Sequence, residues 1–309
     1  MINLAGLLLN VPYGSPFLPQ AVARRLSLTA EEVRWENWNL TDPFLLDLIK
    51  RAVSPDPPPP EASGSPDLVR PAQRSLHKLP ECLLVSYPYS PLVADPLGLV
   101  ARELGQIDSP APAILTRGTQ EKDLPQWTAS EQAFLRERCI QPYLDELAAG
   151  VRKLLDSENL AVLVNIRFFS LKPWLHEPRG RIPLPQISLG LSDEQTPKGL
   201  VHLIGHIFRT FGLWTELDYP QAGTAVPRTL AGRPRLKVLG LGLRRDLYLD
   251  ETKAEFKTSL QSLVRILRTL FCLMGQELDR VAQVRIRRAF PPKPPSSIIK
   301  AAKAGPDLK

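Results

Sequence analysis

Residues 160–166 form an almost unbroken run of apolar residues, interrupted only by Asn165. A run of this kind is typical of a strand buried on both faces, as in the parallel sheets of α/β proteins. Shorter apolar runs that also resemble strands lie at 6–11, 82–85, 185–191 and 236–243. Because helical stretches separate several of these runs, the sequence predicts a three-layer α/β/α fold with a central, mainly parallel mixed sheet.

The stretches between the strands carry helical signals. Thr128 and Glu131 form a capping box, which predicts a helix start, and Pro142 is expected to kink that helix. A second helix is expected over 198–211. Apolar residues from Phe256 to Met274 repeat at helical spacing and predict a long amphipathic helix.

Proline accounts for 32 of the 309 residues, about twice the average share. Residues 54–71 contain four consecutive prolines, and we interpret them as a loop inserted into one domain of residues 1–285. A domain boundary there would leave the 6–11 strand with too little sequence to pair with. Residues 286–309 are rich in Pro and Lys and predict a disordered basic tail.

The net charge of +7 raises the question of nucleic-acid binding. Much of the excess lies in the last quarter, where Phe290 is the only aromatic residue interleaved with the basic residues, so no base-stacking platform is predicted. We therefore interpret the basic segment as a solvated tail and do not expect nucleic acid as a partner. No apolar run approaches the ~18 residues of a membrane-spanning helix.

The cysteines indicate a reducing compartment. Cys82, Cys139 and Cys272 are too far apart to form a disulfide framework or a metal-binding pair. The first residues lack the basic region of a secretion signal. These observations predict a cytoplasmic protein.

Polar residues and cations follow several of the predicted strands, at 12–15, 86–89, 165–167 and 242–245. The carboxyl ends of parallel strands are where α/β proteins place their sites. Histidines and carboxylates do not converge in these segments, so the predicted crevice suits an anion better than a metal or a general base.

A metal-like spacing occurs at His202 and His206, which lie at i and i+4 of the 198–211 helix. Leu203 stands where zinc proteases of this pattern carry a glutamate. His176 is the histidine nearest to this pair in the sequence and would be a third ligand of the metal. We keep this set as the weaker alternative, since surface or partly buried histidines explain the spacing better than a metal site does.

Taken in order, the segments after the strands resemble the N-formylglutamate amidohydrolase family. The Asn-Val-Pro-Tyr-Gly-Ser of 10–15 is similar to its Pro-His-[Ser/Ala]-Gly turn, and Thr41-Asp42 to its Thr-Asp-Glu-Leu-Phe segment. Further segments with similar counterparts are 141–143, 164–167, 185–190, 218–223 and 243–251. The resemblance spans about residues 6–275. It implies the zinc-carboxypeptidase-like α/β fold and hydrolysis of a formyl amide by zinc-activated water.

The sequence departs from the family pattern where that chemistry is located. The family's first histidine is Tyr13 here, its Asp-x-His becomes Asn165-x-Arg167, and the glutamate before the Arg-x-Leu-Tyr block becomes Gly242. An arginine stays cationic and would repel a zinc ion. The departures predict that the metal and catalytic residues are replaced, so we expect no cofactor, with zinc as the alternative.

We therefore hypothesise a pseudoenzyme that keeps the scaffold as a ligand-binding or assembly module for a small anionic ligand or a protein. Candidate ligand-binding residues are Asp42, Arg167, Arg244, Arg245 and Tyr248. An equally simple expectation is that Arg167 pairs with Asp42 in an inert ion pair. One alternative is an active deformylase with its metal moved to the histidines. Another is an interaction protein that acts through its Pro-rich loop and basic tail.

Overall fold

The computed structural model describes Leu4 and residues 6–54, 76–78, 82–98, 114–119, 122–158, 160–171, 183–224 and 226–289, with side chains omitted at 76–78 and 277–289. The insertion expected at 54–71 lies outside these residues except for Ser54. The expected tail lies outside them from residue 290 onward.

Within the described residues, strands and helices alternate along much of the chain. The strands are β1 (Leu7–Val11), β2 (Leu76–Lys78), β3 (Leu83–Ser86), β4 (Ala161–Phe169), β5 (Ile187–Gly190), β6 (Thr215–Leu217), β7 (Leu236–Arg244), β8 (Leu249–Asp250) and β9 (Glu255–Phe256). The α-helices are α1 (Gln20–Leu26), α2 (Ala30–Leu40), α3 (Pro43–Val53), α5 (Ala129–Leu135), α6 (Gln141–Glu158), α7 (Lys198–Thr210) and α8 (Leu260–Ala289). Short π- or 3₁₀-helical segments are η1 (Arg136–Ile140), η2 (Arg228–Leu230) and η3 (Arg245–Leu247).

The main sheet has the strand order β2-β3-β1-β4-β7-β5-β6. The pairs β1–β3, β1–β4, β4–β7 and β5–β6 are parallel, whereas β2–β3 and β5–β7 are antiparallel. β4 pairs with β7 over nine residues at the centre of the sheet. The prediction of a mixed, mainly parallel sheet is therefore confirmed.

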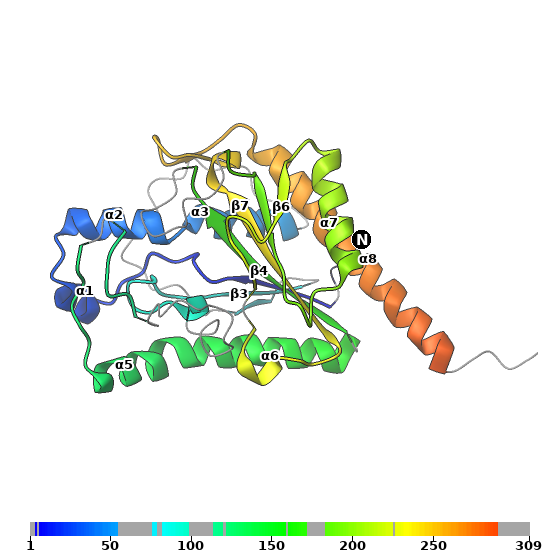
Figure 1. Cartoon of the computed structure of the whole chain (residues 1–309), viewed down its shortest axis with the longest axis horizontal. Coiled ribbons are helices and arrows are strands. Elements are labelled where there is room, and N and C mark those ends of the chain that lie inside the picture. Colours follow the sequence, from blue (N-terminus) through cyan, green and yellow to red (C-terminus); the bar gives the residue numbers. More distant parts are fainter. Residues whose placement is uncertain are drawn as a thin grey trace, which may run out of the picture.

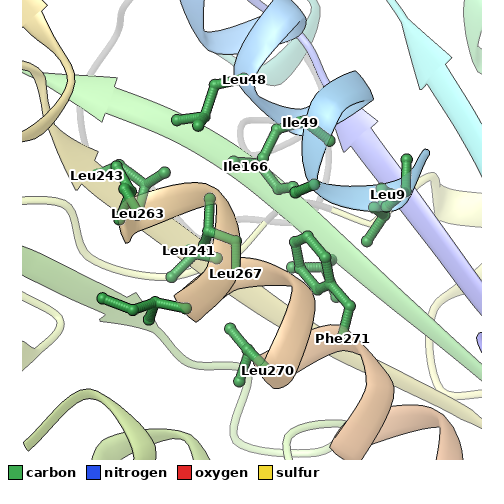
Figure 2. Close-up of a cluster of buried hydrophobic side chains, with 14 of the residues drawn as sticks. Leu9, Leu48, Ile49, Ile166, Leu241, Leu243, Leu263, Leu267, Leu270 and Phe271 are labelled. Atoms are coloured by element: carbon green, nitrogen blue, oxygen red, sulfur yellow. The ribbon is translucent and has the colours of Figure 1, made fainter. Parts of the chain in front are cut away.

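Helices cover both faces of this sheet, as Figure 1 shows for α6 on one side and α3 and α8 on the other. On the α8 side, alternate residues of β1, β4 and β7 point into one apolar core. Figure 2 shows Ile166 and Leu241 of that core packed against Leu267 and Phe271 of α8. The opposite residues, including Leu163, pack with the helices of the α6 side. This two-sided burial explains why the strands read as continuous apolar runs.

The α5–α6 helical segment begins as predicted, and a π-helical turn lies shortly before Pro142, where the sequence predicted a kink. Thr128 accepts a hydrogen bond from the Glu131 backbone N–H, and the Glu131 side chain accepts one from the Thr128 N–H. The interruption is a π-helical turn over Arg136–Ile140, immediately before Pro142. Proline has no N–H for a regular helical bond and its ring crowds the carbonyl four residues earlier, so a local widening of the helix accommodates it.

The expected start of the last helix was wrong. Phe256 belongs to strand β9, and α8 begins at Leu260. Phe256 nevertheless packs edge-on against Phe44 at 5.2 Å between ring centroids, which accounts for its apolar character. The helix also continues to Ala289, beyond the boundary placed after residue 285, and its last part projects away from the sheet (Figure 1).

A membrane-crossing helix was not expected, and within the residues described above none of the helices is both long enough and apolar enough to cross one.

Candidate functional site

The candidate site is formed where the central parallel strands end. The register places Asn10 of β1 beside Asn165 of β4, and Arg167 of β4 beside Gly242 of β7. Because alternate strand residues share a face, these side chains lie on the α6 side of the sheet, beyond the apolar residues of that face.

Asn165 takes part in a buried chain of hydrogen bonds. The Tyr143 hydroxyl donates to Asn10 Oδ1 (2.7 Å), Asn10 Nδ2 donates to Asn165 Oδ1 (2.9 Å), and Asn165 Nδ2 donates to Thr224 Oγ1 (2.8 Å). Burial raises the pKa of Tyr143 above its ordinary value, so its hydroxyl keeps its proton. The chain connects α6, the sheet and the loop after β6, and it uses both the amide oxygen and the amide nitrogen of Asn165.

Arg167 extends from β4 beneath the loop formed by residues 218–224. Its Nη2 donates to the Gly223 carbonyl oxygen at 2.9 Å, and its Nε is enclosed without a hydrogen-bond partner among the described residues. Burial lowers the pKa of Arg167 below its ordinary value, although an arginine stays cationic in a protein. In the described part of the chain, no carboxylate lies within ion-pair distance of it.

Glycines make room for the Arg167 guanidinium and for the loop that covers it. A Cβ atom at Gly190 would lie 2.0 Å from the Gly223 carbonyl oxygen and 2.9 Å from Arg167 Nη2. A Cβ atom at Gly240 would lie 3.0 Å and 3.2 Å from the same two atoms. A side chain at either position would therefore displace the loop or the arginine.

Asp218 holds this loop in place. Its Oδ1 accepts hydrogen bonds from the backbone N–H groups of Leu191 (2.9 Å) and Gly223 (2.8 Å). Asp218 has a φ angle of 50°, in the left-handed region that aspartate tolerates better than most residues. The carboxylate thus links the end of β5 to the loop whose carbonyl receives Arg167.

Gln221 of the same loop places its side chain over Gly242. Its Nε2 donates to the Phe168 carbonyl oxygen at 2.7 Å, while its Oε1 is enclosed and has no partner among the described residues. A Cβ atom at Gly242 would lie 2.7 Å from that Oε1. The Gln221 carboxamide oxygen therefore occupies the space where a side chain at position 242 would begin.

Tyr13 and Asp95 form a partly buried pair at the strand ends. The Tyr13 hydroxyl donates to Asp95 Oδ1 at 2.8 Å, and the backbone N–H of Leu97 donates to the same atom at 3.1 Å. Burial raises the pKa of Tyr13 well above its ordinary value and also raises the pKa of the Asp95 carboxyl. Tyr13 thus remains a neutral phenol with its proton directed to Asp95.

A cavity of about 250 Å³ opens beside this pair. Polar groups on its wall come from Tyr13, Asp95 and Gln221, and the loop at 117–119 contributes a further part. Leu40, Pro91, Leu115, Phe168 and Phe169 supply the apolar part of the lining. Arg167 does not line this cavity.

Asp42, Arg245 and Tyr248 form a fully buried cluster. Arg245 Nε donates to Asp42 Oδ2 at 3.0 Å, the Tyr248 hydroxyl donates to the same oxygen at 2.6 Å, and the Asp42 and Arg245 side chains are 0% and 1% exposed. The guanidinium lies between the rings of Trp38 and Phe168, with centroids at 4.9 and 4.4 Å from Cζ. Asp42 Oδ1 also caps α3 by accepting from the Leu45 N–H. These contacts join the first turn of α3 to the end of β7.

The expected pairing of Arg167 with Asp42 was wrong, because Arg245 is the partner of Asp42. Arg244 is bound to Asp246 and to the carbonyl oxygens of Leu184 and Pro185. The strand-end arginines are therefore held in separate intramolecular contacts rather than gathered into one anion site. Ligand binding by Asp42, Arg167, Arg244, Arg245 or Tyr248 stays a prediction.

Among the residues described with side chains, His202 and His206 do not cluster with other metal ligands. His202 and His206 are exposed on the surface of α7, and His176 lies outside the described residues. Across the described ranges, no group of three or more His, Cys, Asp or Glu side chains has a geometry that could hold a metal ion.

The side chains at the strand ends do not suit a zinc ion. Zinc binds thiolate, neutral imidazole and carboxylate groups. At the positions that resemble the family's ligands the chain places a protonated phenol (Tyr13), a hydrogen-bonded amide (Asn165) and a cation (Arg167). We therefore derive no catalytic step through a metal here.

Asp95, Asp218 and Gln221 were missed as site residues by the sequence analysis. Residues 218–223 had been noted only as a family-like segment, without roles for their side chains. Asp95 lies several residues after Ser86, the last residue of β3. Its place in the segment after a strand is the one sequence signal that could have identified it.

Comparisons with known proteins agree with this architecture. Residues 5–249 match the family model described as N-formylglutamate amidohydrolase. The N-formylglutamate amidohydrolase from Ralstonia eutropha JMP134 is similar in structure, with a TM-score of 0.65 and 18% identity over 90% of this chain and 95% of that one. The gene product Atu2144 from Agrobacterium tumefaciens has a TM-score of 0.60 and 17% identity over 88% and 92%. No curated protein matches. Since the family model covers well over half of its residues, the chain belongs to the N-formylglutamate amidohydrolase family.

Proposed function

We propose that this family member does not hydrolyse amides and instead binds a small ligand at the ends of its central strands. The observation that carries the proposal is the enclosed Arg167 guanidinium, which donates to Gly223 beneath the 218–224 loop. A cation at this place opposes the binding of a second cation such as zinc.

The groups around Arg167 offer no substitute for metal-activated water. Without a metal, water has a pKa near 15.7, so a strong general base would be needed to generate a nucleophile. Gly242 carries no side chain, and the amide oxygen of Gln221 above it is a very weak base. The Asp95 carboxylate already accepts the Tyr13 proton. The Gln221 oxygen is thus too weak a base, and the Asp95 carboxylate is already engaged by the Tyr13 hydroxyl.

In one version of this proposal, the ligand is an anion that Arg167 binds. Buried charges are ordinarily paired, and Arg167 Nε has no partner among the described residues. A carboxylate or phosphate could complete its hydrogen bonds. The version in which the Pro-rich loop and basic tail bind a protein partner rests on residues outside the described part of the chain.

The test is turnover of N-formylglutamate by untagged protein dialysed against zinc, with a hydrolysing family member as positive control in the same buffer. We expect no formate above the buffer background. A His202→Ala, His206→Ala double variant tests the relocated metal site, because its activity would then fall below that of the wild type. Zinc-dependent turnover by the wild-type protein would refute the proposal.

A matched variant tests the reason for the lost activity. Tyr13→His, Asn165→Asp and Arg167→His together place the family-like residue types at the three positions. We expect this variant to bind zinc more tightly than the wild type. Equal zinc affinity of the two proteins would show that the three residues do not decide metal binding.

A further inference from the structure

We infer that the chain forms a homodimer in which β6 of one copy pairs antiparallel with β6 of a second copy, so that the two main sheets join into one continuous sheet. The strand is the last in the order of the main sheet and lies beside α7 (Figure 1). The inference goes beyond the proposed ligand binding and does not rest on it, because no ligand takes part in the pairing.

The outer side of β6 carries hydrogen-bonding groups that the rest of the described chain does not use. The Trp214 carbonyl oxygen accepts from the N–H of Ile187 on β5, so the backbone groups at 214 point toward β5. Since these directions alternate along a strand, the N–H and C=O groups of Thr215 and Leu217 point outward. No hydrogen bond from another described residue reaches these four groups. An added strand completes them.

Large apolar side chains are exposed on both faces of this edge. Phe211, Trp214 and Leu217 are 48%, 42% and 50% exposed. Leu217 pairs in register with the buried Leu189 and so lies on the α7 side of the sheet, whereas Trp214 lies on the opposite face. Phe211 is the C-cap residue of α7. Apolar surface on both sides of one strand edge is typical of a surface that another chain covers.

The sequence of β6 lacks the residues that keep strand edges apart in monomeric proteins. Residues 213–217 read Leu-Trp-Thr-Glu-Leu, without the Lys or Pro that commonly protect an edge. The one charged side chain, Glu216, is already held by Trp214, whose Nε1 donates to Oε1 at 2.8 Å. Arg209 is the only Lys or Arg between residues 199 and 227, so the positive excess of the chain lies elsewhere and opposes self-association here only weakly.

A second copy fits this edge because the strand is complementary to itself about Thr215. With a two-fold axis at Thr215, the two Thr215 residues face each other, Leu213 faces Leu217, and Trp214 faces Glu216. No facing pair brings like charges together, whereas an axis at Glu216 would set two carboxylates opposite each other. The outward N–H and C=O groups of the two Thr215 residues then bond to each other.

The pairing also supports the loop that covers Arg167. Asp218 directly follows β6, and its carboxylate accepts from the N–H groups of Leu191 and Gly223. A second strand on β6 therefore fixes the backbone where the 218–224 loop begins.

The molar mass of the full-length protein in solution tests the inference. Sedimentation velocity and light scattering are measured at chain concentrations from about 1 to 100 µM. We expect a monomer–dimer equilibrium in which the mass approaches twice that of one chain. The mass of one chain throughout this range would overturn the inference and leave the edge of β6 to a strand of another protein.

Two variants test whether the dimer forms through β6. Leu217→Lys places a charge at an exposed position, and Thr215→Pro removes an outward N–H that β5 does not use. Each is expected to raise the dissociation constant of the dimer at least about tenfold while keeping the circular dichroism spectrum of the wild type. Phe134→Lys, at an exposed residue of α5, is the matched control and should dimerise as the wild type does. Unchanged dimerisation in both β6 variants would refute the inference.

Disulfide cross-linking tests the register. Thr215→Cys sets the two new cysteines directly opposite each other, with Cα atoms about 5.5 Å apart, which is within the range of a disulfide. Leu217→Cys sets its two cysteines four residues apart along the strands, or about 13 Å. We therefore expect mild oxidation to cross-link Thr215→Cys faster than Leu217→Cys, each compared with the wild type. Faster cross-linking of Leu217→Cys would refute the axis at Thr215.

The outcome is separable from that of the proposed function. Hydrolysis of N-formylglutamate would refute the non-hydrolysing proposal whatever the mass of the protein in solution. A monomeric protein without turnover would refute the inference about β6 alone.

Discussion

The buried Asp42–Arg245 pair should be among the most important polar contacts for stability in this fold. Replacing Asp42 by Ala leaves the Arg245 guanidinium buried without its counterion, which typically costs about 3–5 kcal/mol. It also removes the cap of α3, worth about 1 kcal/mol. We therefore expect Asp42→Ala to lower the free energy of unfolding by about 4–6 kcal/mol, much of the ~5–15 kcal/mol available to a typical domain.

Urea unfolding followed by circular dichroism measures this effect, and two further variants separate its parts. Asp42→Asn keeps an oxygen that can cap α3 and should lose about 1 kcal/mol less than Asp42→Ala. Asp42→Asn combined with Arg245→Met removes both charges and should be more stable than Asp42→Asn alone, because no unpaired buried charge remains. Asp123→Ala is the matched control, since its pair with Arg117 is largely exposed and should contribute about 1 kcal/mol or less.

A loss below about 2 kcal/mol in Asp42→Ala, no larger than the loss in Asp123→Ala, would show that the buried pair does not stabilise the fold as expected.

The remaining predictions concern glycine, pH and the end of α3. Gly190→Ala should lower the free energy of unfolding by more than about 1 kcal/mol because its Cβ would meet the Gly223 carbonyl at 2.0 Å. Gly205→Ala, in open space on α7, should raise it by up to about 1 kcal/mol in the same urea unfolding experiment. The Asp95 carboxyl has a raised pKa in the folded state, so the folded protein binds its proton more tightly, and stability falls as pH rises from the unfolded-state value through the folded one. Across that pH range the free energy of unfolding of Asp95→Asn should therefore rise relative to that of the wild type. A difference between the two free energies that does not change with pH would contradict this. Arg268 donates three hydrogen bonds to carbonyl oxygens at the end of α3. Arg268→Ala should therefore lower the free energy of unfolding by about 2–4 kcal/mol. A loss below about 1 kcal/mol would contradict this expectation.

Much of the fold was predictable because burial on both faces leaves a clear trace in the sequence. The apolar run at 160–166 corresponds to β4, and the periodic segment at 198–211 corresponds to α7. Phe256 shows the limit of this approach. It is apolar at helical spacing, yet it packs from a short strand against Phe44, so periodicity alone assigned it to the wrong element.

The site was less predictable because its contacts join distant parts of the chain. Strand ends were correctly identified as the place of the polar residues. However, the partner of Asp42 is Arg245, 203 positions away, and the partner of Arg167 is the backbone of Gly223. Which of several arginines meets which acceptor depends on the sheet register and the loop path, and neither can be derived from local pattern.

The family resemblance identified the fold and the departures from the family pattern. It did not show which contacts the replaced residues make in place of metal ligation and catalysis. The structure places the Gln221 oxygen over Gly242 and directs the Tyr13 proton to Asp95. These internal contacts are the physical basis for proposing that the site binds a ligand without hydrolysis.

The most direct test of the central claim is the metal content of the protein, measured by inductively coupled plasma mass spectrometry after purification without a His-tag or chelators. We expect far less than one zinc per chain, because the Arg167 guanidinium is itself a cation at the strand ends, where the family resemblance places the metal. About one zinc per chain would contradict this expectation.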